Sequence, residues 1–404
     1  MEVPLNPFSR RLEKVLGHVS GINLADLDPT TRLDIAKHVG RLSYRFTRER
    51  KLEIGNYLED SATALAYLAY FFPVNAAKVY RLLDELAPTF ADIDSNPIRV
   101  LDLGCGPGTG AMAVLDWVQS KGWFQSGRVQ CVAVDQSSAS LTACQRLWSA
   151  YCGAEGNSSH TLLPFRENLQ EGLSRQIKHA GGATGYDLII IQNVLSELAT
   201  GKLSGEEVRT RLITIALDIL SDHGTVMVIE PALRDASRQL HEVRDRLLRE
   251  RKCTVYSPCL HERSCPALVN PNDWCHEERA WSPPTWIKAI DRDVGFIKDA
   301  LKFSYLLLRK DGRSIVPRAP DLYRVVSELR VFKGEKRAWL CNENGRPEAG
   351  RLDRKRSPSN AAFDDWHRGA IVRISEIVRK ERNGKLSTVG RIESDTAAQI
   401  IRSV

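Results

Sequence analysis

From Ile98 onward, apolar runs alternate with stretches in which apolar positions recur at helical spacing. The run Ile98–Leu103 predicts a buried strand, and residues 111–118 predict the helix after it. Further strands are expected at 129–134, 161–165, 186–191, 225–229 and 302–308, with helices at 138–151, 206–220 and 233–249. Strands that alternate with helices predict a mainly parallel sheet with helices on both faces.

The flanking regions have different patterns. Residues 1–95 predict helices, one starting at Asp28-Pro-Thr-Thr31 and others at 58–72 and 76–86. After about residue 311 the pattern predicts strands at 327–332 and 337–341, a periodic run of undecided type at 370–375 and a basic loop at 351–356. We therefore expect three regions: an N-terminal helical region (1–95), an α/β domain (96–310) and a small, barrel-like, β-rich module (311–404).

The strand at Ile98–Leu103 ends in a glycine-rich turn. Four glycines follow it before the next helix, namely Gly104, Gly106, Gly108 and Gly110. Glycines let the backbone approach a ligand closely, and a helix N-terminus offers free N–H groups to a polar one. Asp102, just before the turn, can accept hydrogen bonds from a cationic amine. The string Asp-x-Gly-x-Gly-x-Gly resembles motif I of class I S-adenosylmethionine (SAM) methyltransferases, which implies a Rossmann-like sheet.

Polar residues at the ends of later strands complete the predicted SAM site. Asp135 follows the second strand, where an acid can bind both ribose hydroxyls of an adenosine group, a spacing that also suits NAD enzymes. Asn168, after the third strand, could reach the adenine amine. Gln192 ends the fourth strand, and Asn193 and Glu197 beyond it are the candidates for orienting a methyl acceptor.

Composition and charge limit the function classes. The apolar fraction of 43% is ordinary for a soluble chain, no apolar run is long enough to span a bilayer, and nine cysteines argue against a secreted disulfide scaffold. We expect a protein of the reducing cytoplasm without a membrane role.

Charge is unevenly distributed along the chain. Residues 301–404 hold 23 Lys and Arg against 13 Asp and Glu, whereas residues 1–300 hold 34 against 37. This asymmetry predicts docking on a polyanion such as RNA or, equally, a solvated basic surface. Sequence-specific DNA binding is not expected.

A second basic stretch lies near the N-terminus. Residues 41–51 place five Arg and Lys side chains around Tyr44 and Phe46. Such a face could contact RNA phosphates and bases, but the solvated side of an amphipathic helix is slightly favoured.

Four of the nine cysteines fall in one proline-rich insert, residues 251–283. They are Cys253, Cys259, Cys265 and Cys275, with His261 and His276 nearby. Clustered thiolates need a cation, and tetrahedral sulfur sites hold zinc or an iron–sulfur cluster. Zinc sites prefer closely spaced cysteine pairs, whereas the wide spacing here favours a [4Fe–4S] cluster; zinc and unliganded cysteines stay as alternatives. The spacing is not that of radical SAM enzymes.

The cysteine insert also carries a family resemblance. Together with motif I, Pro258-Cys259-Leu-His261, Cys265-Pro266 and Asp273-Trp-Cys-His276 resemble the methyltransferase-like factors of the small ribosomal subunit. This family comprises the mitochondrial methyltransferase-like protein seventeen, its yeast counterpart and bacterial homologues, and the resemblance runs from about 30 to 310. It implies a cytoplasmic or mitochondrial factor of small-subunit assembly that contacts rRNA, with SAM at motif I and a [4Fe–4S] cluster on the four cysteines.

Whether the chain is an enzyme is left open by its sequence. After the fourth strand, base-amino methyltransferases place Asp/Asn-Pro-Pro-aromatic, but this chain has Gln192-Asn193-Val194-Leu195. Three hypotheses follow: a SAM-binding assembly factor with an iron–sulfur module, which is preferred; an active rRNA methyltransferase; and a small-molecule or protein methyltransferase with a zinc-stabilised insert.

Overall fold

The computed structural model divides the chain into two compact units. Unit 1 comprises residues 1–230 and 280–301, and unit 2 comprises residues 231–279 and 302–404. The structure describes residues 9–49, 58–92, 97–121, 127–153, 159–198, 204–297, 299–379, 381–382 and 385–403. The units differ from the three expected regions, because the N-terminal helices belong with the parallel strands and the cysteine segment belongs with the C-terminal strands.

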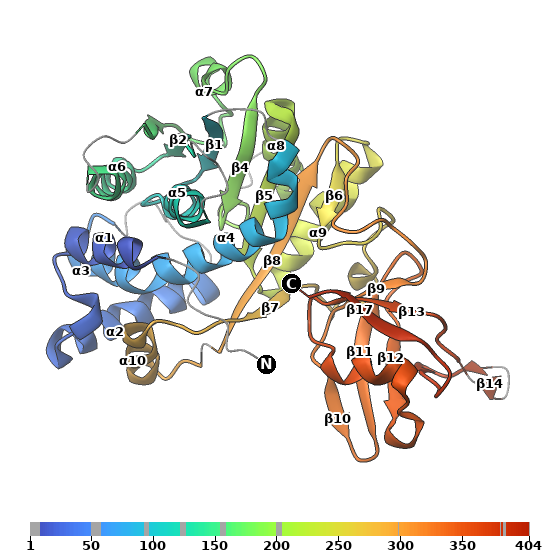
Figure 1. Ribbon diagram of the computed structural model, residues 1–404. Helices are drawn as coiled ribbons and strands as arrows, with labels where there is room; N and C mark the ends of the chain where they lie inside the picture. Colours follow the sequence, from blue (N-terminus) through green and yellow to red (C-terminus); the bar gives the residue numbers. More distant parts are fainter. Residues whose placement is uncertain are drawn as a thin grey trace. The chain divides into compact units, whose positions relative to one another are not determined.

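Unit 1 is built on five parallel strands in the order β3-β2-β1-β4-β5 (Figure 1). They are β1 (Ile98–Leu103), β2 (Val129–Asp135), β3 (Thr161–Arg166), β4 (Tyr186–Gln192) and β5 (Leu220–Pro231). The strand predictions at 98–103, 129–134, 161–165, 186–191 and 225–229 are confirmed. In β1, Asp102 is in register with Ala133 of β2 and Ile190 of β4, so the carboxyl ends of the three strands meet at one edge.

Helices surround these strands. They are α1 (Arg10–Ser20), α2 (Pro29–Tyr44), α3 (Ser61–Ala66), α4 (Phe72–Leu86), α5 (Thr109–Lys121), α6 (Ser138–Gly153), α7 (Arg175–Ala180), α8 (Gly205–Asp218) and α10 (Thr285–Val294). Asp28 begins α2 by accepting the N–H groups of Thr30 and Thr31, as its position in the sequence predicts. Pro73 does not separate two helices: it lies in the first turn of α4, where its missing N–H costs no hydrogen bond. A π-helical turn, Tyr67–Phe71, precedes α4.

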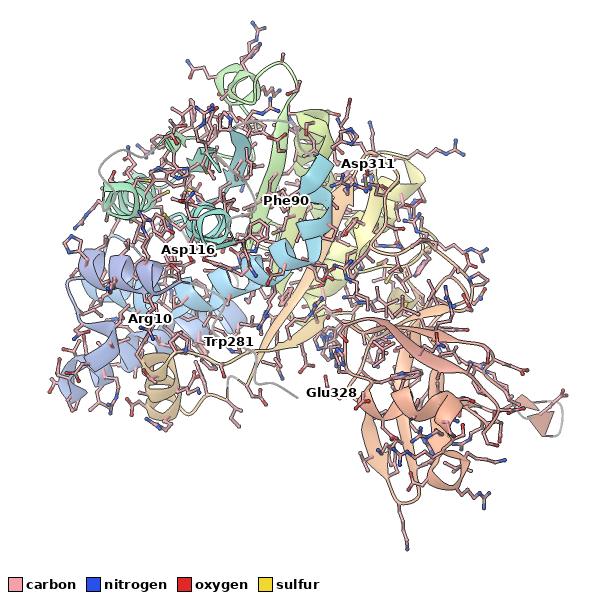
Figure 2. All side chains as sticks on the ribbon, viewed as in Figure 1. Arg10, Phe90, Asp116, Trp281, Asp311 and Glu328 are labelled. Atoms are coloured by element: carbon pink, nitrogen blue, oxygen red, sulfur yellow. The ribbon has the colours of Figure 1, made fainter. Side chains whose placement is uncertain are left out.

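Asp116 of α5 anchors the N-terminal helix (Figure 2). Its side chain is fully buried and accepts hydrogen bonds from the hydroxyl groups of Tyr80, Tyr151 and Ser9, and from the Ser9 N–H. Ser9 is also the N-cap of α1. A buried carboxylate needs several donors, and here they come from helices α4 and α6 and from the start of α1.

Unit 2 begins with α9 (Arg234–Arg249) and contains two sets of strands. In the first set, β8 (Ala300–Arg309) pairs antiparallel with β6 (Thr254–Ser257) and also pairs with β7 (Glu277–Ala280). The second set has the order β16-β12-β11-β9-β13-β17, with β10 paired to β11. Its strands are β9 (Leu322–Val325), β10 (Arg330–Phe332), β11 (Glu335–Cys341), β12 (Glu348–Leu352), β13 (Ile371–Ile374), β16 (Val389–Arg391) and β17 (Ala398–Arg402), while β14 (Glu381–Arg382) pairs with β15 (Lys385–Leu386).

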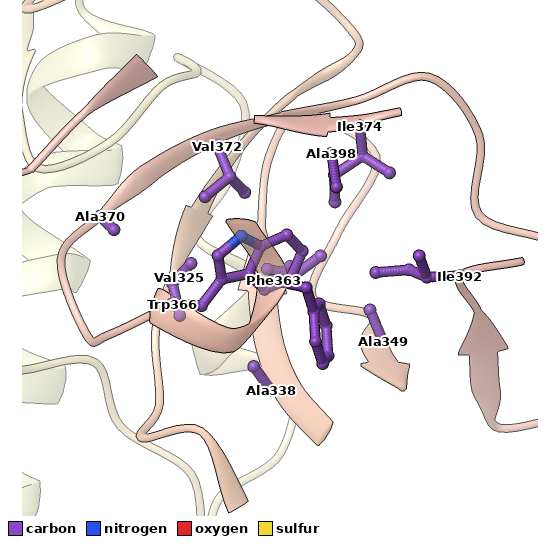
Figure 3. Packing of buried hydrophobic residues seen from close by; sticks show 11 residues of the cluster. Val325, Ala338, Ala349, Phe363, Trp366, Ala370, Val372, Ile374, Ile392 and Ala398 are labelled. Atoms are coloured by element: carbon purple, nitrogen blue, oxygen red, sulfur yellow. The ribbon is translucent and has the colours of Figure 1, made fainter. Parts of the chain in front are cut away.

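The second strand set encloses a small apolar core (Figure 3). Phe363 and Trp366 lie at its centre with ring centroids 4.5 Å apart, surrounded by residues from β9, β11 and β13. Arg351 lies 5.0 Å from the Phe363 ring centroid and donates a hydrogen bond to Asp364. Arg351 is therefore a buried structural residue near the end of β12, although the sequence predicted it as the start of a basic loop.

Candidate functional site

The glycine turn after β1 has a backbone that only glycine adopts without strain. Gly104, Gly106 and Gly108 have φ values of 69°, 54° and 84°. A Cβ atom on Gly108 would lie 2.5 Å from the Cys144 sulfur, and one on Gly104 would collide with Val194. The loop therefore packs tightly on its own unit and presents backbone at the carboxyl end of β1.

Two predicted acids are held at this loop by backbone N–H groups. Asp102 accepts the Ala111 N–H at 2.8 Å, and Gly110 leaves the space that this carboxylate occupies. Asp135 accepts the N–H groups of Gly106 at 2.9 Å and Ser137 at 2.8 Å. Burial raises the pKa of Asp102 to about 7, with a further contribution from the charge of Asp135. The structure thus brings Asp102, Asp135 and the glycine turn together as predicted.

The end of β4 adds polar groups to the same edge. Asn193 has a backbone φ of 58°, which is unusual for a residue other than glycine. Its buried Oδ1 atom accepts no hydrogen bond from any residue that the structure describes. Gln192 instead donates from its side chain to the Asn75 carbonyl at 3.0 Å, which ties β4 to α4. Asn193 is therefore the better placed of the two for a ligand contact.

Glu197 and Glu230 form an acidic pair beyond β4. Glu230 accepts the N–H groups of Leu195 at 2.9 Å and Ser196 at 3.3 Å, which fixes the turn that carries Glu197. The surrounding protein and the charges of Glu230 and Asp135 raise the pKa of Glu197 to about 8, although the residue is exposed on one side. Sequence reasoning did not select Glu230; its position at the end of β5, on the same edge as Asp102, was the available signal.

Asn168 is occupied by a local turn. Its side-chain oxygen accepts the Gln170 N–H at 3.1 Å, and its amide donates to Glu171 at 3.3 Å. The oxygen has a second lone pair that could accept a hydrogen bond from an adenine amine, and this contact stays a prediction.

The structure gathers three of the four predicted cysteines and adds one from elsewhere. Burial raises the pKa of the Cys341 thiol, and so do the nearby charges of Cys275, Cys259 and Cys265. Cys341 ends β11, far along the chain from the insert. Cys253 differs: burial raises its pKa to about 12, and the neighbouring charges that act on it are those of Glu262 and Arg244. Its interactions therefore do not place it with the other predicted ligands.

Two cations from α9 face these thiols. Burial disfavours ionisation of Cys265, but the charge of His241, its contact with the sulfur and the charge of Arg244 outweigh burial and lower the pKa of Cys265. His241 is 1% exposed, and neither of its ring nitrogens has a hydrogen bond of ordinary geometry among the described residues. Soft sulfur donors beside a buried imidazole form a donor set that suits zinc or an iron–sulfur cluster.

Within the described ranges, no three His, Cys, Asp or Glu side chains are positioned as ligands of one metal ion. The cysteine segment is instead held by protein contacts. Arg238 donates to the carbonyl groups of Ala267, Leu268, Asn270 and Asp273 at 2.8–3.2 Å.

The N-terminal basic stretch offers less surface than its sequence predicts. Phe46 packs edge-to-face on Phe71 with centroids 5.3 Å apart, while Tyr44 is exposed. Arg50 and Lys51 lie outside the described residues. As for membranes, no described helix is both long and apolar enough to cross a bilayer.

The parallel strand order, the glycine turn and the acid at the end of the neighbouring strand define a class I methyltransferase-like protein. Residues 61–359 match the family described as mitochondrial small ribosomal subunit Rsm22, and the chain belongs to this family. The match confirms the resemblance to methyltransferase-like small-subunit factors.

Solved methyltransferases are similar at low identity. The plantazolicin methyltransferase BpumL, in complex with SAH, is 12% identical over 74% of this chain and 95% of its own, with a TM-score of 0.32. The CcbJ methyltransferase from Streptomyces caelestis is 20% identical with a TM-score of 0.25; the match covers 36% of this chain and about half of that protein (47%). These TM-scores are low. None of the curated proteins matches the chain.

Proposed function

We propose that the chain binds SAM at the glycine turn and associates with the small ribosomal subunit as a methyltransferase-like assembly factor. The observation that carries the first part is the group formed by the turn, Asp102 and Asp135 at one edge of the sheet. Asp135 would bind the ribose hydroxyls and Asp102 the amine. The side-chain oxygen of Asn193, which has no partner among the described residues, would accept a further hydrogen bond. Family membership supports the second part.

Titration calorimetry with SAM tests the first part. Wild-type protein should bind SAM, and Asp135→Ala should weaken binding about tenfold or more, because hydrogen bonds to charged groups contribute roughly 1.5–3 kcal/mol. Asp218→Ala, on the exposed end of α8, is the matched control. A wild-type chain that does not bind SAM would refute this part.

Sedimentation of the full chain with small ribosomal subunits tests the second part, the association with the subunit. Absence of the chain from the subunit fractions would contradict it.

Catalysis on rRNA is a second candidate. It is favoured by Glu197, an exposed acid at the same edge as Asp102 whose pKa is raised to about 8, since such a group can exchange protons with a methyl acceptor. Transfer of labelled methyl groups to immature small subunits, abolished by Asp102→Ala, would distinguish an enzyme from a factor that only binds SAM.

We further propose a [4Fe–4S] cluster on Cys259, Cys265, Cys275 and Cys341. This set replaces Cys253 by Cys341, because the electrostatic neighbours of Cys341 are the other three thiols. A bound cluster would cross-link the insert to β11. Zinc held with His241 is the alternative ligand. Such a site fits any reducing compartment with ribosomes, including the cytoplasm expected from the sequence and the mitochondria named for the family.

A further inference from the structure

The hairpin formed by β10 and β11 carries an aromatic and cationic face that the proposed SAM and cysteine sites do not use. Arg330 pairs with Arg337, and Phe332 pairs with Glu335, across the two strands. Because side chains alternate along a strand, Arg330, Phe332, Arg337 and Trp339 share one face of the hairpin. We call these four residues the hairpin face.

The aromatic rings of the hairpin face are exposed. Phe332 is 43% exposed and Trp339 is 38% exposed, whereas large aromatic side chains are usually more deeply buried. The opposite face of β11 is anchored, because Ala338 and Leu340 are buried in the apolar core around Phe363. The strand is therefore fixed on its inner side and presents its rings outward.

Guanidinium groups are arranged around the two rings. The Arg330 carbon Cζ lies 5.8 Å from the Phe332 centroid and 6.0 Å from the Trp339 centroid, and that of Arg337 lies 4.9 Å from Phe332. Glutamates hold these arginines in place: Glu348 accepts from Arg330 and Glu335 accepts from Arg337. Gly350 of β12 leaves room for Arg337 and Arg391 beside it. The face thus combines fixed aromatic and cationic planes.

Charge indicates the kind of partner. On the hairpin face Arg330 and Arg337 are balanced by Glu348 and Glu335, and Lys336 pairs with Asp364 on the other side. The positive excess around the face comes from Lys333 in the turn and from the C-terminal quarter, where residues 301–404 hold 23 Lys and Arg against 13 Asp and Glu. Exposed rings interleaved with cations match a ligand that has both flat apolar faces and negative charge, which describes unpaired nucleotides. Double-stranded RNA stacks its bases internally and would leave the rings without a ligand.

We propose that the hairpin face binds single-stranded RNA, with unpaired bases stacked on Phe332 and Trp339 and phosphates beside Arg330 and Arg337. This deepens the proposed association with the small ribosomal subunit and rests on it for the source of the RNA. The binding chemistry itself depends only on the face.

Fluorescence anisotropy with the full chain tests the proposal, using a labelled oligouridine strand and an RNA duplex as probes. The wild type should prefer the single strand. The double variant Phe332→Leu/Trp339→Leu keeps apolar side chains but removes the rings, and it should lose about tenfold or more in affinity, since each base–aromatic stack contributes substantially. Val331→Leu is the matched control, because Val331 lies on the same strand, is 72% exposed and points to the other side.

Several outcomes overturn the proposal. Equal affinity of the double variant and the wild type refutes it, as does equal binding of single strand and duplex, or no RNA binding with capture of a protein by the same face. Trp339→Phe retains a ring and should restore most of the affinity that Trp339→Leu loses, which separates stacking from a folding defect. RNA binding without sedimentation on small subunits would instead refute the proposed function and leave this inference standing.

Discussion

Asp102 is buried beside a second acid, and its protonation should link stability to SAM binding. Its pKa in the folded protein, about 7, lies above the ordinary 3.8, so the folded state binds the proton more tightly than the unfolded state. Its contribution to stability is therefore complete below about pH 4 and is lost as the pH rises to about 7. The folded protein is thus less stable when Asp102 is ionised, but the ionised acid lies next to the glycine turn.

Asp102→Asn should consequently stabilise the ligand-free chain at about pH 8 more than at about pH 5, while weakening SAM binding. The isosteric amide can still accept the Ala111 N–H. Thermal unfolding at both pH values measures the first effect, and calorimetry measures the second. Asp218→Asn, at the exposed end of α8, is the control. An equal difference in melting temperature at both pH values would contradict the role of Asp102.

At the scale of elements, local patterns predicted unit 1 well. A β-branched run, four glycines and a helix are contiguous in sequence, so Asp102 and the turn could be located directly, and Asp135 followed from the parallel register. Cys341 could not be found this way. It joins Cys259 and Cys275 only because β11 pairs with β9 and β12, and such long-range pairing leaves no spacing signal in the chain. The buried role of Arg351 was hidden for the same reason.

Strand β11 therefore decides which cysteine is the fourth ligand of the proposed cluster. After anaerobic purification, Cys341→Ser should reduce bound iron and sulfide by more than half and lower the melting temperature, because ligand binding and folding are coupled. Cys253→Ser is the matched control and should retain both. Iron and sulfide analysis with an absorption spectrum makes the measurement; the reverse pattern would restore Cys253 as the ligand, and zinc in place of iron would exclude a cluster.

At the scale of the whole molecule, we expect the buried carboxyls of unit 1 and the ion-paired carboxyls of unit 2 to respond to pH in opposite directions. Burial raises the pKa of Glu230 and Asp102 in unit 1, so the stability that these carboxyls contribute is lost as the pH rises. In unit 2, hydrogen bonds from Arg351 and Lys336 outweigh burial and lower the pKa of Asp364 to about 2. An ion-paired carboxylate such as Asp364 stabilises the folded state at pH values above its ordinary pKa. That stability is lost as the pH falls towards about 2.

Hydrogen exchange read separately for each unit should show this opposition. Lowering the pH from about 8 to about 5 should increase the free energy of opening in unit 1, and further acidification to about 3 should decrease it first in unit 2. Intrinsic exchange rates at each pH serve as the reference. Protection that changes in the same direction in both units over each step would contradict the assignment.

The contact between Gly108 and Cys144 also makes the glycine turn chemically observable. Cys144 is fully buried, and its sulfur lies where a side chain on Gly108 would be. An alkylating reagent can reach this thiol only when the turn moves away from α6. The alkylation rate of Cys144 should therefore report how often the turn opens. Mass spectrometry can measure this rate in the wild-type chain before any nucleoside is added.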